Sequence, residues 1–63
     1  MRVTEFKKAA LAIGCWLERE GSKHEIWRSP ITGERFRLSR DGSKDLTPQA
    51  EHQLRKLAGL NKK

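Results

Sequence analysis

The N-terminal part of the chain repeats apolar residues at the spacing of an amphipathic helix. Four of them fall at i, i+3, i+4 and i+7 and so share one helical face: Phe6, Ala9, Ala10 and Ile13. We expect Thr4 to be the N-cap, because its hydroxyl can accept a hydrogen bond from a free backbone N–H of the first turn. Gly14 is the natural residue to end this helix in a left-handed conformation.

The next segments change to the pattern of short strands. The apolar run 15–17 precedes polar residues and the pair Gly21-Ser22, which predicts a strand followed by a turn. A second strand is expected from His24 to Arg28, where Ile26 and Trp27 suit a pleated surface.

A hairpin loop and a third strand are expected to follow. In the loop 29–33, Pro30 fixes φ early and Gly33 can supply a positive φ late. Between residues 34 and 40, Phe36 and Leu38 alternate with polar residues, which indicates a half-buried strand whose outer face is basic.

The C-terminal part again has the pattern of a helix. Thr47 is expected as N-cap with Pro48 at the first helical position, and Gly59 as the residue that ends the helix. Its apolar face is formed by Ala50, Leu54, Leu57 and Ala58. We expect Leu60 to fold back onto Leu54 and the last three residues, 61–63, to fray.

The predicted order of elements is therefore αβββα in a single domain that spans residues 1–63. Both helices carry one apolar stripe, and a three-stranded antiparallel sheet has one face to bury them against. We predict an α+β fold in which both helices cover the same face of the sheet.

Composition indicates the cellular location of the protein and the chemical class of its partner. A net charge of +6 on 63 residues favours a polyanion, with nucleic acid ahead of an acidic protein. The single cysteine cannot form an intrachain disulfide, and we see no signal peptide and no apolar run long enough for a membrane span. We therefore expect a cytoplasmic protein without membrane association.

The sequence offers little for metal or cofactor chemistry. One cysteine and two histidines do not form a familiar ligand spacing, and no glycine-rich phosphate loop is visible, so we expect neither metal nor cofactor. Cys15 stands beside Trp16 and is expected to be a buried, inert residue rather than a nucleophile. His52 is expected to face solvent on the second helix.

His24 is the better candidate for chemistry, because imidazole can take up and release a proton near neutral pH. RNA carries its own nucleophile, the 2′-hydroxyl, so its cleavage needs a proton acceptor, a proton donor and cationic groups near the phosphate. The other interpretation is that His24 is only a solvated surface residue.

Basic residues and a turn could bind the phosphates. Eight residues are expected to contact RNA: Gly21, Ser22, Lys23, Arg28, Arg35, Arg37, Arg40 and Lys44. The arginines of the third strand could instead form a solvated edge that discourages strand pairing. Trp16 and Trp27 could stack on bases, but packing residues are the favoured interpretation.

Several of these motifs together resemble the HicA toxins of bacterial toxin–antitoxin pairs. The resemblance covers about residues 5–60 and includes the GSKH of Gly21–His24, the hairpin SPITGERFRLS and the closing LRKLAGL. It implies a fold like the double-stranded-RNA-binding domain, ribosome-independent mRNA interferase activity, and His24 as the catalytic residue. It also implies a cognate HicB antitoxin that binds the toxin and blocks its site.

The leading expectation is therefore a small endoribonuclease toxin that cleaves mRNA without metal. It would be monomeric alone and form a hetero-oligomer with its antitoxin. The alternative is a non-catalytic RNA-binding module of the same fold, in which the histidine is incidental. A third hypothesis, a surface that binds an acidic partner protein, is compatible with the toxin hypothesis.

Overall fold

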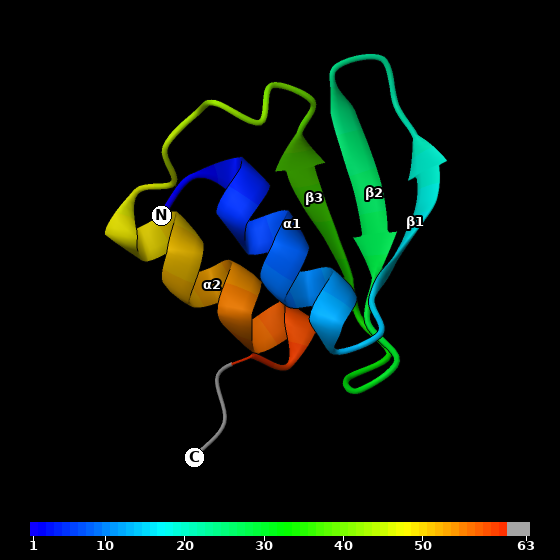
Figure 1. Cartoon of the computed structure of the whole chain (residues 1–63). Helices are drawn as coiled ribbons and strands as arrows, with labels where there is room; N and C mark the ends of the chain where they lie inside the picture. The colour runs from blue at the N-terminus through cyan, green and yellow to red at the C-terminus, as the bar shows by residue number, and fades with distance from the viewer. Residues whose placement is uncertain (61–63) are drawn as a thin grey trace.

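The computed structural model describes residues 1–60 and contains five elements in the order αβββα (Figure 1). They are α1 (Val3–Ala12), β1 (Trp16–Glu20), β2 (His24–Arg28), β3 (Arg35–Ser39) and α2 (Pro48–Ala58). The predicted element order and fold class are confirmed. The predicted fraying of residues 61–63 lies outside the described residues.

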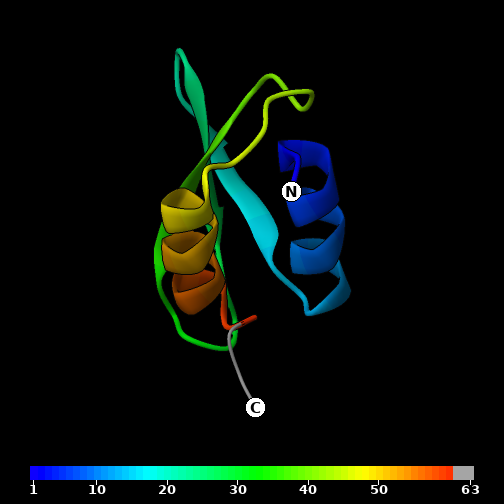
Figure 2. The same cartoon turned by 90° about the vertical axis from the view of Figure 1, so that its left-hand side faces the viewer.

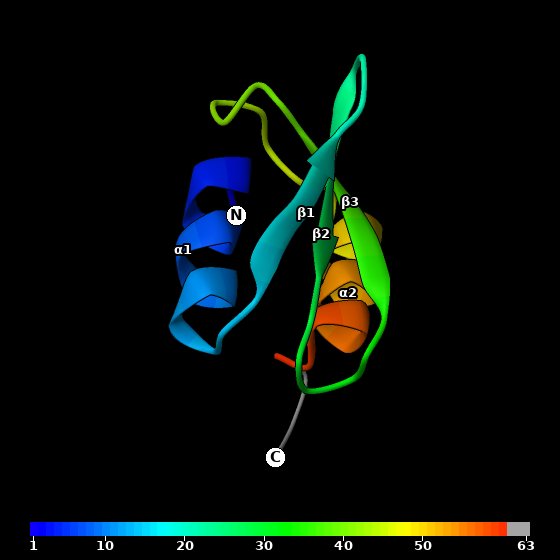
Figure 3. The same cartoon turned by 90° about the vertical axis from the view of Figure 1, so that its right-hand side faces the viewer.

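The three strands form one antiparallel sheet in the order β1-β2-β3. Phe6 of α1 and Ala58 of α2 lie in one buried cluster with Phe36 of β3, so both helices pack on the same face of this sheet. Figure 1 shows both helices to the left of the strands, and Figures 2 and 3 show α1 and α2 from opposite sides. The other face, which we call the open face, is covered by neither helix. Within residues 1–60, no helix has both the length and the apolar character that a membrane crossing requires.

The core lies between the sheet and the two helices. Phe6 of α1 packs edge-on against Phe36 of β3 with ring centroids 5.9 Å apart, and Trp27 of β2 stacks on the same ring at 6.5 Å. The remaining buried apolar residues are Val3, Ala10, Cys15, Leu38 and Ala58. Phe36 and Leu38 therefore point to the helices, and the intervening arginines point to the open face, as the alternation predicts.

The start of α1 differs from the prediction. The N-cap is Arg2, and Thr4 is already inside the helix, where its hydroxyl donates a hydrogen bond to the carbonyl of Gly42 at 2.7 Å. The earlier start also brings Val3 into the core, with 1% of its surface exposed. Thr4 thus ties α1 to the loop before α2, a long-range contact that local sequence does not reveal.

The predicted boundaries of α2 are confirmed. The hydroxyl of Thr47 accepts a hydrogen bond from the N–H of Ala50, and Pro48 occupies the first turn. Gly59 follows with a φ of 88°, and the N–H of Leu60 donates to the carbonyl of Arg55 at 2.8 Å.

Strand β1 extends to Glu20, directly before the predicted turn at Gly21-Ser22, and contains an irregularity. Leu17 pairs with Trp27 and Arg19 pairs with Ile26, so Glu18 is an extra residue, as in a β-bulge. Because a bulge changes the alternation, Glu18 and Arg19 both lie on the open face, where Glu18 reaches arginines of the neighbouring strands. The polar residues 18–20, which follow the apolar run, belong to the strand, and every residue of β1 is exposed.

The two tryptophans have different roles. Trp27 is 5% exposed and packs in the core, as predicted. Trp16 is 45% exposed and pairs with Arg28 in the register of β1 and β2, so its preferred interpretation as a packing residue is wrong. Directly paired residues share a face of the sheet, which places Trp16 on the open face.

Candidate functional site

The turn between β1 and β2 places His24 at the first position of β2. The N–H of Gly21 donates a hydrogen bond to the carbonyl of His24 at 2.7 Å, which closes the turn around Ser22 and Lys23. A Cβ atom at Gly21 would lie 3.0 Å from that carbonyl oxygen, so glycine permits this close approach. The amide of Gly21 is therefore already paired, whereas the side chains of residues 22–24 are exposed.

Arg40, which directly follows β3, stabilises this turn by hydrogen bonding. Its guanidinium donates to the carbonyl of Gly21 at 3.1 Å and lies 3.4 Å from the carboxylate of Glu20. Glu20 needs such a partner, because it stands directly opposite Glu25 in the sheet. Arg40, predicted to contact RNA, is thus placed where it can also hold the turn that carries His24.

A shallow hollow in the surface surrounds the turn. It is lined by the continuous segment Arg19–His24 together with Ile26 and Arg37. In the register of β2 and β3, His24 pairs with Ser39 and Ile26 pairs with Arg37. The hollow therefore combines an imidazole, a hydroxyl, an ammonium group and guanidinium groups at one end of the open face.

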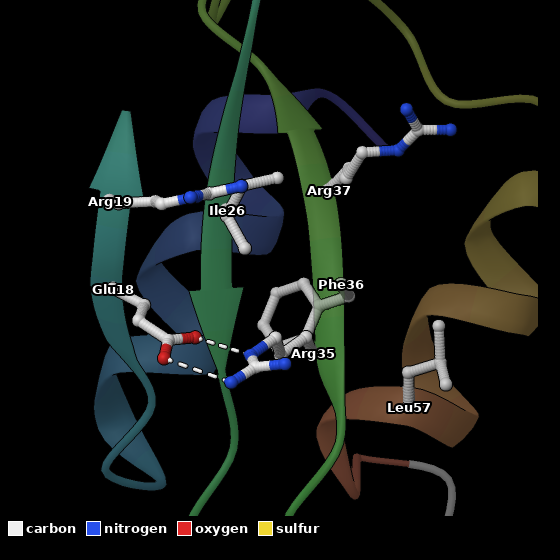
Figure 4. Close-up of a pocket in the computed structure, with 7 residues that line it drawn as sticks. All are labelled: Glu18, Arg19, Ile26, Arg35, Phe36, Arg37 and Leu57. Carbon is white, nitrogen blue, oxygen red and sulfur yellow. Dashed lines mark hydrogen bonds and ion pairs between the residues drawn. The ribbon is translucent and has the colours of Figure 1, made fainter. Parts of the chain in front are cut away.

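Arg19 is a member of this site that the sequence reasoning missed. Figure 4 shows its side chain crossing β2 beside Ile26, while Arg37 extends past β3. Within residues 1–60, neither arginine forms a salt bridge or a side-chain hydrogen bond, so both guanidinium groups can accept a new anionic partner. The signal that places Arg19 here is the bulge at Glu18, which strict strand alternation does not foresee.

The other end of the open face is electrostatically different. Glu18 receives hydrogen bonds from Arg35 at 2.8 and 3.4 Å (Figure 4). One oxygen of Glu18 also lies 3.7 Å from Arg28. The hydrogen bonds from Arg35 hold the pKa of the Glu18 carboxyl below its usual value, and Glu18 in turn raises the pKa of Arg35. Two of the predicted phosphate contacts, Arg28 and Arg35, thus already have a carboxylate partner.

Lys44 is the one predicted contact that lies apart from the others. It belongs to the loop between β3 and α2, and its carbonyl accepts a hydrogen bond from the N–H of Val3 at the start of α1. Figure 1 shows this loop arching toward the N-terminus of α1, away from the turn between β1 and β2. The structure brings Ser22, Lys23, His24 and Arg37 together and leaves Lys44 on the helix side.

The other chemical candidates lie elsewhere. Cys15 is buried, with its sulfur 3.9 Å from the carbonyl of Ala58. His52 is exposed on α2, as predicted. In the part of the chain that the structure describes, no three His, Cys, Asp or Glu side chains are grouped so that they could hold a metal ion.

The site at His24 can support acid–base chemistry on a bound phosphodiester. An exposed imidazole can accept a proton from a hydroxyl within hydrogen-bond reach, and cationic groups nearby can stabilise charge on the phosphate oxygens. Glu20 and Lys23 also line the hollow, but Glu20 is paired with Arg40, which makes Lys23 the better candidate for a proton donor. No protein-family model, curated protein or solved structure matches this chain.

Proposed function

We propose that the protein is an endoribonuclease toxin that cleaves mRNA without the ribosome, with His24 as its catalytic residue. The observation that carries the proposal is the hollow in which exposed His24 stands with Lys23 and the unpaired guanidinium groups of Arg19 and Arg37. The GSKH motif and the αβββα order, which resemble HicA toxins, support the same function.

The chemistry requires two proton transfers and no further reactant. His24 accepts the proton of a ribose 2′-hydroxyl, and the 2′-oxygen attacks the adjacent phosphorus. The bond from phosphorus to the 5′-oxygen breaks, and that oxygen takes a proton from Lys23 or water. The products are a 2′,3′-cyclic phosphate and a 5′-hydroxyl, and Arg19 and Arg37 stabilise the additional negative charge on the phosphate oxygens during the transfer.

Regulation of such an activity calls for a partner that covers the hollow. We propose a HicB-like antitoxin in the cytoplasm, which would bind the toxin as a hetero-oligomer and exclude RNA from His24. The basic residues of the turn and of β3 offer charge complementarity to an acidic segment of that partner. The isolated toxin would be a monomer under this proposal.

A second candidate function is a non-catalytic RNA-binding module. One observation favours it: within residues 1–60, no hydrogen bond to another side chain or to the backbone orients the imidazole of His24. A catalytic histidine is commonly held by such a bond, although substrate can also supply the orientation. The basic open face would serve both functions equally.

Replacement of His24 separates these candidates. We expect His24→Ala to slow RNA cleavage by about 10²–10⁴-fold, since that is the usual contribution of general acid–base catalysis. Cleavage is measured on a labelled RNA in the presence of a chelator, and growth arrest on induction gives a second readout. The matched control is His52→Ala, which removes the other histidine from an exposed position on α2.

Two outcomes decide the matter. Chelator-resistant cleavage that is lost in His24→Ala and kept in His52→Ala, at unchanged thermal stability, supports the enzyme. A stable, salt-sensitive RNA complex without cleavage, identical in all three proteins, shows that the protein is the binding module.

A further inference from the structure

We infer that the open face is a platform for single-stranded RNA, with one base stacked on Trp16 and the backbone running toward His24. This inference rests on the proposed function in one respect only, namely that the polyanion is RNA. It adds a substrate class and a base-binding residue, which the catalytic proposal leaves open.

The exposure of Trp16 is the first observation. With 45% of its surface exposed, it is a large aromatic side chain on the open face, where its pairing with Arg28 places it. On the next strand, the ring of Trp27 stacks on Phe36, and its indole N–H donates a hydrogen bond to Glu25 at 3.1 Å. Exposed aromatic rings on an antiparallel sheet are a common means of binding unpaired bases, because every base has a π-face.

The charge of the open face indicates which class of ligand binds there. The residues of the open face include four arginines and one glutamate, placed there by the register of the three strands: Arg19, Arg28, Arg35, Arg37 and Glu18. The surplus of positive charge favours a polyanion. The apolar side chain of Ile26 lies at the centre of these charges, which suits the sugar and base of a nucleotide better than a chain of carboxylates.

The geometry links the platform to the catalytic end. Trp16 pairs with Arg28, and His24 lies four residues before Arg28 on β2, which is about 13 Å along the strand. A flexible single strand can lay a base on Trp16 and a phosphate near Arg19 and His24. In a duplex the bases are stacked on one another, so binding would use the arginines and leave Trp16 without a partner.

The test measures binding to an RNA that cannot be cleaved. A labelled oligonucleotide with 2′-O-methyl groups lacks the nucleophile, so the measurement does not depend on catalysis. We expect tighter binding to the single strand than to the same strand annealed to its complement. Trp16→Ala should weaken binding to the single strand by about fivefold to 150-fold, the usual loss when one stacked base loses its aromatic partner.

A matched control and a conservative variant complete the test. Leu11→Ala removes a comparably exposed apolar side chain from α1, and its affinity should equal that of the parent. Trp16→Phe should retain most of the affinity, because the ring still stacks. Thermal unfolding of all three variants shows whether the fold is intact.

The inference fails if the folded Trp16→Ala binds the single strand as tightly as Leu11→Ala does, or if the duplex binds equally well. An acidic protein partner replaces RNA as the ligand if two results hold. Polyglutamate displaces the RNA, and polyglutamate binds the parent and Trp16→Ala with equal affinity. Cleavage of RNA by a Trp16→Ala variant with unchanged affinity would overturn the platform and keep the catalytic proposal. A complex that depends on Trp16 but is never cleaved would keep the platform and overturn the catalytic proposal.

Discussion

The two ends of the open face carry the same kind of side chain in different electrostatic settings. At one end, Glu18 holds Arg35 by hydrogen bonds and lies close to Arg28. Nearer to His24, opposite Ile26, the guanidinium groups of Arg19 and Arg37 form no salt bridge within residues 1–60, and Arg19 acts on the pKa of Glu18 only through its charge. One bulged residue thus divides a basic surface into a paired half and an unpaired half.

The number of arginines on the open face is therefore larger than the number that are free to bind phosphate. A guanidinium that leaves a carboxylate for a phosphate exchanges one ion pair for another and gains little. A guanidinium that leaves water gains a new charge-assisted hydrogen bond. Affinity should therefore concentrate at the end where the proposed chemistry takes place.

Among the charged residues of the open face, the largest effect on affinity is expected from a change in the unpaired half. Arg37→Gln should weaken binding of the uncleavable single strand by roughly tenfold, or about 1.4 kcal/mol, and reduce the salt slope by about one. Arg35→Gln is the matched control on the same strand, and we expect roughly a threefold loss at most, since Glu18 already shares its charge. Titration of RNA at several salt concentrations gives both quantities. Equal losses would show that the two halves do not differ.

Removal of the carboxylate should make the two halves alike. Glu18→Gln frees Arg28 and Arg35, so we expect affinity to rise by roughly threefold and the salt dependence to become steeper. The matched control is Glu34→Gln, which makes the same charge change in the exposed hairpin loop. A gain as large in the control would indicate a general charge effect.

This gain should be independent of pH over the neutral range. Because Arg35 lowers the pKa of Glu18, the carboxylate stays charged until the pH falls below the ordinary range of a glutamate, roughly pH 4. The parent and Glu18→Gln should therefore differ by the same factor between roughly pH 5 and pH 8. Convergence of the two proteins at mildly acidic pH would contradict the assigned ion pair.

A small effect, on kcat rather than on affinity, is expected at Arg40, which holds the turn between β1 and β2. Arg40→Gln removes the contacts with Gly21 and Glu20, so His24 should be held less firmly and kcat should fall by roughly threefold with little change in affinity. Lys8→Gln, on the exposed side of α1, makes the same charge change as a control. A loss of affinity with unchanged kcat would show that Arg40 binds phosphate directly.

Local sequence patterns predicted the fold well, because most of its determinants are local. The cap at Thr47, the positive φ of Gly14, Gly33 and Gly59, and the alternation around Phe36 are each set by a few neighbouring residues. The element order and the shared face of the two helices follow from these patterns.

The candidate site was predicted only in part, because its arrangement depends on pairing between strands. The motif identified His24 and its turn, but the bulge that brings Arg19 to the open face is set by the register with β2. The exposure of Trp16 follows from its pairing with Arg28, and the contact of Glu18 with Arg35 likewise joins residues of different strands. The hydrogen bond from Thr4 to Gly42 joins residues 38 positions apart, which no local pattern can indicate.

The bulge also bears on how the molecule avoids other copies of itself. Strand β1 is an edge of the sheet, and its outer side offers unpaired backbone groups to any extended chain. An extra residue at Glu18 interrupts the regular ladder that an added strand would need. A residue that shapes the open face thus also interrupts an exposed edge where a strand could otherwise add, as the proposed monomeric state would require.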